Sequence, residues 1–267
     1  MDNSKSTGVI HPVRYGRKDR FSFMCHKGLS CFTSCCRGIN ILLTPYDILR
    51  LKKRLELSSQ EFLSLYTEVN LLEKTDIPVV SLKMLDDEKN SCPFVRDDGC
   101  LIYLDRPSTC RYYPLGVVSL SHKEHNQEED FYFFINESHC RGFEENREWS
   151  IEEWRVDQGV DIQDAINAGW TDLIVRKRSF PMNIQLTEKS KQLFFTACYN
   201  IDEFKRFVFE SSFLTLHQID EHTITEIQAD EISLLQFAFA WLKWILFKDG
   251  NFSLDPEAVN RRNATKA

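Results

Sequence analysis

The chain has 267 residues, of which 42% are hydrophobic and 27% charged, and its formal net charge at pH 7 is -7. This composition suits one large or two small globular domains and excludes a largely disordered chain. The acidic balance argues against a general polyanion-binding surface, because phosphate neutralisation needs a basic excess, so no nucleic-acid partner is expected.

The amino-terminal residues contain no apolar stretch followed by a small-residue cleavage site, which predicts a cytoplasmic protein. The most apolar segment, roughly residues 232–247, carries Gln236 and Lys243 and is short for a bilayer span of about 20 residues. We therefore expect a buried core helix there and no membrane partner. In a reducing compartment grouped thiols are ligands or redox groups, whereas an oxidising compartment would favour a disulfide framework.

Two helices are predicted in the first quarter of the chain. Thr44 supplies an N-cap hydroxyl, Pro45 fits the first helical position and Asp47 the third, so a helix should begin there. Ser58 and Glu61 form a second capping box. The second helix is expected to bury a stripe of apolar residues: Phe62, Leu65, Tyr66 and Val69.

Strand signals follow these helices. Turn residues around Asp98 and Gly99 predict a hairpin or meander that presents Cys92 and Cys100. A further hairpin is expected around the polar loop 121–130, and its return strand delivers Cys140. The strand segments are 79–84, 117–120 and 131–135.

From Ser150 onward the pattern is helical. Ser150 and Glu153 form a third capping box, and Thr187, Asn200 and Asp230 each precede a segment with helical periodicity. The sequence therefore predicts an α+β fold, with a cysteine-rich metal-binding N-terminal region of short hairpins and helices followed by a mainly helical C-terminal region. The predicted domains are 21–145 and 146–255, and the two can share one core.

Eight of the nine cysteines fall in two bursts and one later position. Grouped thiolates are soft ligands for zinc or an iron–sulfur cluster, and each such centre takes four protein ligands. Eight thiols could hold two centres, or four or five could hold one while the rest are buried. Adjacent side chains are expected to point apart, so Cys35 and Cys36 should not easily share one ion. The candidate metal ligands are Cys25, Cys31, Cys35, Cys36, Cys92, Cys100, Cys110 and Cys140.

Other polar residues lie beside these cysteines. Arg106 and Arg111 flank Cys110 and could offset thiolate charge, although a surface salt bridge for each explains them equally well. His26 and His139 adjoin cysteines, but an ordinarily hydrogen-bonded histidine is the favoured interpretation of both. Packing or hydrogen bonding to ligands is predicted for Tyr103, Tyr112 and Tyr113, and burial in the core for Cys198.

Several segments of the sequence, in the order in which they occur, resemble the YkgJ-type cysteine cluster family. That family is described as a zinc- or iron-chelating domain, often written CxxxCxxCC, and the flagellin lysine-N-methylases look like its relatives. The resemblance spans about residues 21 to 142. It is carried by Phe23-Met24-Cys25, Cys31-x3-Cys35-Cys36-Arg37, Leu43-Thr44-Pro45-Tyr46-Asp47, Cys92-Pro93-Phe94, Gly99-Cys100, Arg106-Pro107-x-x-Cys110-Arg111-Tyr112-Tyr113-Pro114 and Cys140-Arg141-Gly142.

Three classes of function remain open. The first is a metal-binding protein that chelates zinc or an iron–sulfur cluster, with a 4Fe-4S cluster favoured. The second is an iron–sulfur-dependent enzyme, such as a protein lysine methylase or oxidoreductase, acting on a protein or small molecule. The third is a zinc-stapled structural interaction module. The sequence lacks the GxSxG, GxGxxG, P-loop and HExxH motifs, so it does not decide whether the protein is an enzyme.

Overall fold

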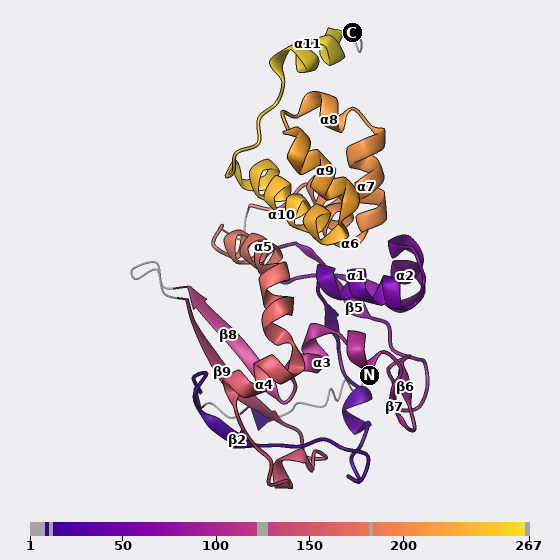
Figure 1. Cartoon of the computed structure of the whole chain (residues 1–267), viewed down its shortest axis with the longest axis vertical. Helices are drawn as coiled ribbons and strands as arrows, with labels where there is room; N and C mark the ends of the chain where they lie inside the picture. Colours follow the sequence, from indigo (N-terminus) through magenta and orange to yellow (C-terminus); the bar gives the residue numbers. More distant parts are fainter. Residues whose placement is uncertain (1–8, 11–12, 122–127, 182–183, 265–267) are drawn as a thin grey trace. The chain divides into compact units, whose positions relative to one another are not determined.

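The fold is α+β, as predicted, with short antiparallel strands in the N-terminal half and helices in the C-terminal half (Figure 1). The computed structural model describes residues 9–10, 13–121, 128–181 and 184–264.

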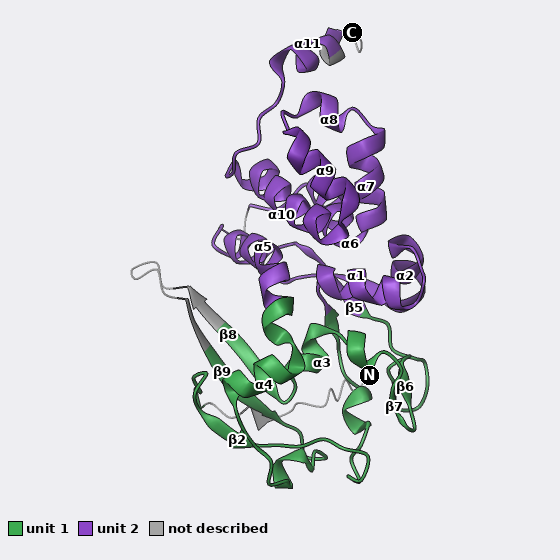
Figure 2. Cartoon of the chain, viewed as in Figure 1, with its two compact units in different colours: residues 1–42, 82–163 green, residues 43–81, 164–267 purple. Residues whose placement is uncertain are grey.

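The chain forms two compact units, each made of two separate pieces of sequence (Figure 2). Unit 1 contains Met1–Leu42 and Leu82–Gln163. Unit 2 contains Leu43–Ser81 and Asp164–Ala267. The predicted domain boundary at residue 145 remains a prediction. A division into compact units does not measure which segments are stable on their own.

Unit 1 is built on three small antiparallel sheets. The central hairpin pairs β8 with β9 from Leu115 opposite Phe134 to Ser121 opposite Glu128, which confirms the predicted hairpin. Residues 122–127 of its predicted polar loop lie outside the described residues. The strands of unit 1 are β1 (Val9–Ile10), β2 (Arg20–Ser22), β6 (Val95–Arg96), β7 (Gly99–Cys100), β8 (Leu115–Ser121), β9 (Glu128–Asn136) and β10 (Glu148–Ser150).

Short helical turns connect these strands. The capping box predicted at Ser150 and Glu153 is present and begins α4 (Ile151–Gln158). The remaining helical elements of unit 1 are η1 (Ser34–Cys36), η2 (Tyr103–Asp105), α3 (Ser108–Tyr112) and η3 (Gly142–Glu144). The boundary between the units falls inside α5 (Val160–Arg178).

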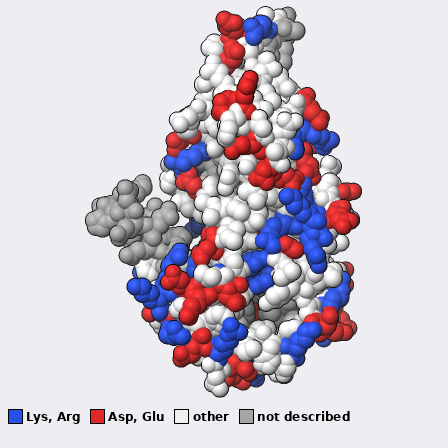
Figure 3. Space-filling model, viewed as in Figure 1, with Lys and Arg blue, Asp and Glu red and all other residues white. Residues whose placement is uncertain are grey.

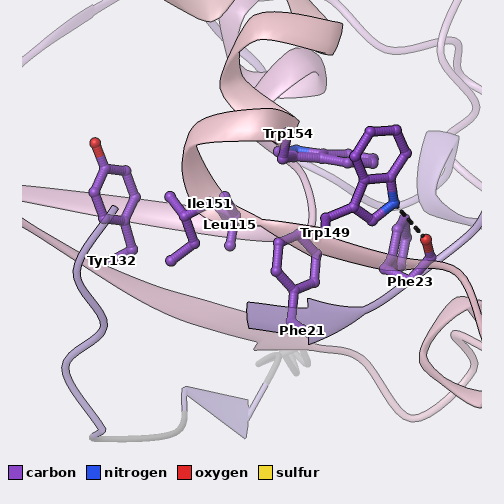
Figure 4. Packing of buried hydrophobic residues seen from close by; sticks show 7 residues of the cluster. All are labelled: Phe21, Phe23, Leu115, Tyr132, Trp149, Ile151 and Trp154. Atoms are coloured by element: carbon purple, nitrogen blue, oxygen red, sulfur yellow. Dashed lines mark hydrogen bonds between the residues drawn. The ribbon is translucent and has the colours of Figure 1, made fainter. Parts of the chain in front are cut away.

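An aromatic cluster forms the core of unit 1. Trp149 and Trp154 pack edge to face with ring centroids 5.4 Å apart, and the Trp149 indole N–H donates to the carbonyl of Phe23 at 2.9 Å (Figure 4). Because the rings come from β2, β10 and α4, burying them holds these elements together. The buried members are Phe21, Phe23, Leu115, Tyr132, Trp149, Ile151 and Trp154.

Unit 2 begins with the two predicted helices. The capping boxes at Thr44 and Ser58 are both present and begin α1 (Pro45–Arg54) and α2 (Ser59–Tyr66). The stripe predicted for α2 is only partly right. Phe62 is fully buried, but Leu65 and Val69 are 61% and 54% exposed. Val69 lies outside the helix, because α2 ends at Tyr66 and the chain continues as strand β4 (Thr67–Leu71).

The rest of unit 2 is a small sheet and a helical bundle. The sheet has the order β3-β5-β4, with β3 (Leu42–Leu43) and β5 (Pro78–Leu82) at the boundary between the units and β4 (Thr67–Leu71) at one edge. The caps predicted at Thr187 and Asp230 are present, whereas the Asn200 side chain accepts from Ser59 instead. The helices are α6 (Glu188–Tyr199), α7 (Ile201–Glu210), α8 (Phe213–Leu216), α9 (Glu221–Ala229), α10 (Glu231–Phe247) and α11 (Pro256–Ala264).

The basic residues at the end of α1 are paired within unit 2. The Lys52 ammonium is buried and lies 2.6 Å from Asp202 and 2.5 Å from Glu231, and Lys53 lies 2.9 Å from Glu231. Both basic and acidic side chains lie on the face drawn in Figure 3.

The most apolar predicted segment forms α10, whose buried residues include Leu235, Ala238 and Leu242. Among the described residues no helix combines the length and apolar character that crossing a membrane requires.

His217 is a half-buried titratable group in unit 2. It stacks on Phe213 with ring centroids 4.1 Å apart, its Nδ1 lies 2.9 Å from the Phe213 carbonyl, and its Nε2 accepts from the Trp241 indole at 3.3 Å. Burial lowers the pKa of His217 below its ordinary value, although the Phe213 carbonyl works in the opposite direction.

This environment predicts a pH-dependent stability. The unfolded chain takes up a proton on His217 near pH 6.5, at higher pH than the folded chain, so the free energy of unfolding should fall as the pH drops below about 6.5. His217→Gln should flatten this dependence, whereas His222→Gln, at a side chain 81% exposed, should leave it unchanged. Denaturant unfolding at several pH values, followed by circular dichroism, measures both slopes. Equal slopes in His217→Gln and the unmodified protein would contradict the prediction.

Candidate metal centre

The segment that carries Cys25 is held against the segment that follows Cys140. The amide of Met24 donates to the carbonyl of Gly142 at 3.0 Å. A Cβ atom at Gly142 would lie 2.5 Å from Cε2 of Phe23, so this close approach needs glycine. The close approach of Phe23 therefore explains why glycine stands two residues after Cys140 in the pattern Cys140-x-Gly142.

The two bursts of cysteines meet at η1. The carbonyl of Cys36 accepts from the amide of Cys92 at 2.8 Å, and Arg37 forms an isolated β-bridge with Ser91. The segment before η1 turns through Thr33, whose φ of 66° is left-handed. Residues nearly sixty positions apart in sequence thus lie side by side.

The predicted hairpin near Cys92 and Cys100 is also present. Strands β6 and β7 pair with Val95 opposite Cys100, and the amide of Val95 donates to the Cys92 carbonyl at 3.1 Å. Gly99 turns the hairpin with a φ of 134°, which favours glycine.

Four cysteines lie close enough that their thiolates would repel one another, and we call them the four-thiol set. As thiolates, the other three members would raise the pKa of Cys25, and two of them would raise the pKa of Cys140. The Cys31 sulfur accepts from the amide of Arg141 at 3.2 Å. Cys25 is exposed and the others are half-buried. The set consists of Cys25, Cys31, Cys35 and Cys140.

The environment of this set disfavours thiolates when no cation is present. Although the residue is exposed, partial desolvation of its thiol, followed by repulsion from neighbouring thiolates, raises the pKa of Cys25 to about 11. A hydrogen bond with Cys36, burial and repulsion from Cys36 and Glu137 raise the pKa of Cys35 well above its usual range. Burial also raises the pKa of Cys140, which a hydrogen bond from Tyr113 partly offsets. A cation among these sulfurs would reverse the effect, because a coordinating thiol is deprotonated.

The remaining candidate cysteines occupy neighbouring positions in unit 1. Burial raises the pKa of Cys92 and of Cys100, and Cys100 is repelled by Cys35. Cys110 lies half-buried on α3. The Cys35 and Cys36 thiols hydrogen-bond to each other, contrary to the expectation that they point apart, since rotation about Cα–Cβ can bring adjacent sulfurs together.

The donor set fits zinc or iron in its chemistry, because thiolates are the soft ligands that these metals take. Among the residues that the structure describes, however, no group of three or more His, Cys, Asp or Glu side chains is already placed to hold a metal ion. Side-chain rotation must therefore accompany binding. This is consistent with protonated thiols, which have no charge to draw them around a common point.

The two arginines differ from each other in their contacts. Arg111 is buried and donates to the carbonyls of Arg106 at 2.9 Å and Gln158 at 2.8 Å, so it braces the backbone. Arg106 lies over the Tyr103 ring at 4.1 Å and lowers the pKa of Cys100 without overcoming the effect of burial. Arg106 thus acts electrostatically on a candidate ligand in the predicted sense.

Both histidines beside cysteines have other contacts. His26 accepts from the amide of Gly28 through Nδ1 at 3.1 Å, and its Nε2 lies 3.5 Å from Glu145. His139 Nε2 lies 3.3 Å from Oε2 of Glu137. These contacts agree with ordinarily hydrogen-bonded histidines. Cys198, predicted to be core, is 1% exposed on α6.

Glu137 is a site residue that sequence reasoning missed. Its side chain is 14% exposed, it repels Cys35, and its Oε2 accepts from the Tyr113 hydroxyl at 3.3 Å. The sequence offers one weak signal, a carboxylate three residues before Cys140 at the end of a predicted strand.

The short antiparallel strands and the cysteines gathered in unit 1 form a cysteine-rich region with a candidate metal centre. Residues 24–141 match the family model CxxCxxCC, described as a putative zinc- or iron-chelating domain. This match confirms the predicted resemblance to a cysteine cluster family of that description. No curated protein and no solved structure matches the chain.

Proposed function

We propose that this protein binds one metal centre through the four-thiol set, with an iron–sulfur cluster favoured over zinc. The observation that supports this most is the mutual repulsion of Cys25, Cys31, Cys35 and Cys140. These cysteines come from three stretches of chain, and four thiolates are the number that a closed zinc site or a fully liganded cluster takes.

The thiols outside the set favour the cluster over zinc. Cys36 hydrogen-bonds to Cys35, and Cys100 is repelled by Cys35, so the site is richer in sulfur than one tetrahedral zinc needs. A bound cluster would supply electron transfer or Lewis acidity, whereas zinc would supply folding energy. The chain's own part is to gather the thiols, exclude water from Cys35 and release their protons when the metal enters.

Anaerobic purification followed by metal and sulfide analysis tests the proposal. We expect iron together with acid-labile sulfide in the purified protein. Stoichiometric zinc with neither colour nor sulfide would overturn the cluster version and leave a zinc centre. Protein that contains neither metal, and takes up neither when reconstituted with zinc or with ferrous iron and sulfide, would overturn the metal-binding proposal itself.

A further inference from the structure

Strand β4 in unit 2 is an edge strand that is exposed on both of its faces. It pairs with β5 on one side, and among the described residues no strand pairs with its other side. Its first residue, Thr67, is half-buried, and the four residues that follow are all exposed. The outer edge of β4 therefore presents backbone donors and acceptors with which another strand can pair.

The two faces of β4 differ in character, because successive side chains of a strand point to opposite faces. One face carries Thr67, Val69 and Leu71. The other carries Glu68 and Asn70. Val69 and Leu71 are 54% and 53% exposed, so the apolar face is only partly covered. Glu68 is the one charged residue of the strand.

From this pattern we infer that β4 is an interaction surface for a second copy of this chain, which pairs with it antiparallel across a two-fold axis at Val69. Two-fold dimers are the commonest symmetric assemblies, and each surface in them meets its own copy. In this pairing Glu68 lies opposite Asn70 of the second copy, and Thr67 lies opposite Leu71. Directly opposite side chains point to the same face, so apolar residues meet apolar residues and no charge meets a like charge.

The neighbouring two-fold registers fit less well. A pair centred on Glu68 would place two carboxylates directly opposite each other, which is destabilising. A pair centred on Asn70 would leave Thr67 without a partner in the strand and place Glu68 opposite Leu72. A basic extended peptide would find a single carboxylate on the strand, which gives it little charge to recognise. The self-complementary order of the residues therefore favours a second copy.

The interface is small, so we expect a weak dimer. Each copy contributes a strand of 5 residues, against roughly 20–30 residues a side in a standard interface. Sedimentation equilibrium of the full chain at up to about 300 µM should show monomer and dimer in exchange, with a dissociation constant in the micromolar range. A monomer at every concentration would overturn the inference.

Variants of Asn70 test the register, because this residue lies opposite Glu68 twice in each dimer. Asn70→Lys should form two ion pairs across the strands and lower the dissociation constant by about 2- to 30-fold, whereas Asn70→Glu should raise it by a similar factor. Glu68→Lys combined with Asn70→Glu restores opposite charges and should bind at least as tightly as the unmodified protein. Both side chains are exposed, so folding should be unaffected, which circular dichroism checks.

Gln236→Lys is the matched control. Gln236 is an exposed amide side chain on α10 of the same unit, so the variant adds the same charge away from β4 and should leave the dissociation constant unchanged. The inference fails if Asn70→Lys and Asn70→Glu shift the constant in the same direction or not at all, or if the double variant does not regain affinity. These outcomes do not depend on metal, so the proposed function is tested separately.

Discussion

Cys35→Ser should abolish stoichiometric metal binding. Cys35 interacts electrostatically with Cys25, Cys36, Cys140 and Glu137. Serine keeps the size and hydrogen-bonding capacity of the side chain but removes the soft sulfur donor. Loss of an outer hydrogen-bond partner already costs about 10–100-fold in metal affinity, so loss of a ligand should cost more than about 100-fold.

Metal content per chain after anaerobic purification, together with chelator competition, measures this effect. Cys198→Ala is the matched control, because Cys198 is a cysteine 1% exposed on α6 of unit 2 and outside the proposed ligand set. It should retain the metal content of the unmodified protein. Cys35→Ser protein that retains full metal would show that the set is wrongly assigned.

Phe23→Ala should lower the free energy of unfolding of unit 1 by about 3–5 kcal/mol, the usual cost of truncating a buried aromatic side chain. Phe23 is 2% exposed, and its ring centroid lies 5.1 Å from that of Phe143 and 5.5 Å from that of Trp154. It also packs edge to face on Tyr113 at 6.1 Å. The cavity would therefore open next to both Cys25 and Cys140.

Denaturant unfolding of the metal-free protein separates this effect from metal binding. Phe180→Ala is a suitable control, because Phe180 is 38% exposed and makes one ring contact with Phe247. It should change the free energy of unfolding by about 1 kcal/mol or less. Equal losses in the two variants would mean that Phe23 is not part of a close-packed core. Metal affinity should also decrease in Phe23→Ala, since the cavity loosens the segments that carry Cys25 and Cys140.

Local signals in the sequence predicted where most helices begin. The boxes at Thr44, Ser58 and Ser150 all form, because a capping box involves residues within four positions of each other. The prediction that Val69 continues the buried stripe of helix α2 was wrong, because Val69 lies in strand β4. Whether a chain continues as a helix or as strand β4 depends on pairing with a distant strand, which periodicity does not reveal.

The discontinuous units could not be seen in sequence. Leu43–Ser81 belongs to the same compact unit as Asp164–Ala267, and contacts such as the one between Lys52 and Asp202 join positions 150 residues apart. A composition or linker signal marks a boundary only where the chain passes once between units. Here the chain passes between them three times.

The sequence by itself determined the residue types of the candidate metal ligands and the family model that residues 24–141 match, because both depend on cysteine spacing and short motifs. Only the tertiary structure decided which thiols repel one another, that Arg111 braces backbone carbonyls, and that Glu137 lies beside Cys35. The spacing of residues along a chain limits the distance only between residues that are close in sequence. Proximity across β2, η1 and the end of β9 results from burying Phe23 and its aromatic partners, which is a property of the whole core.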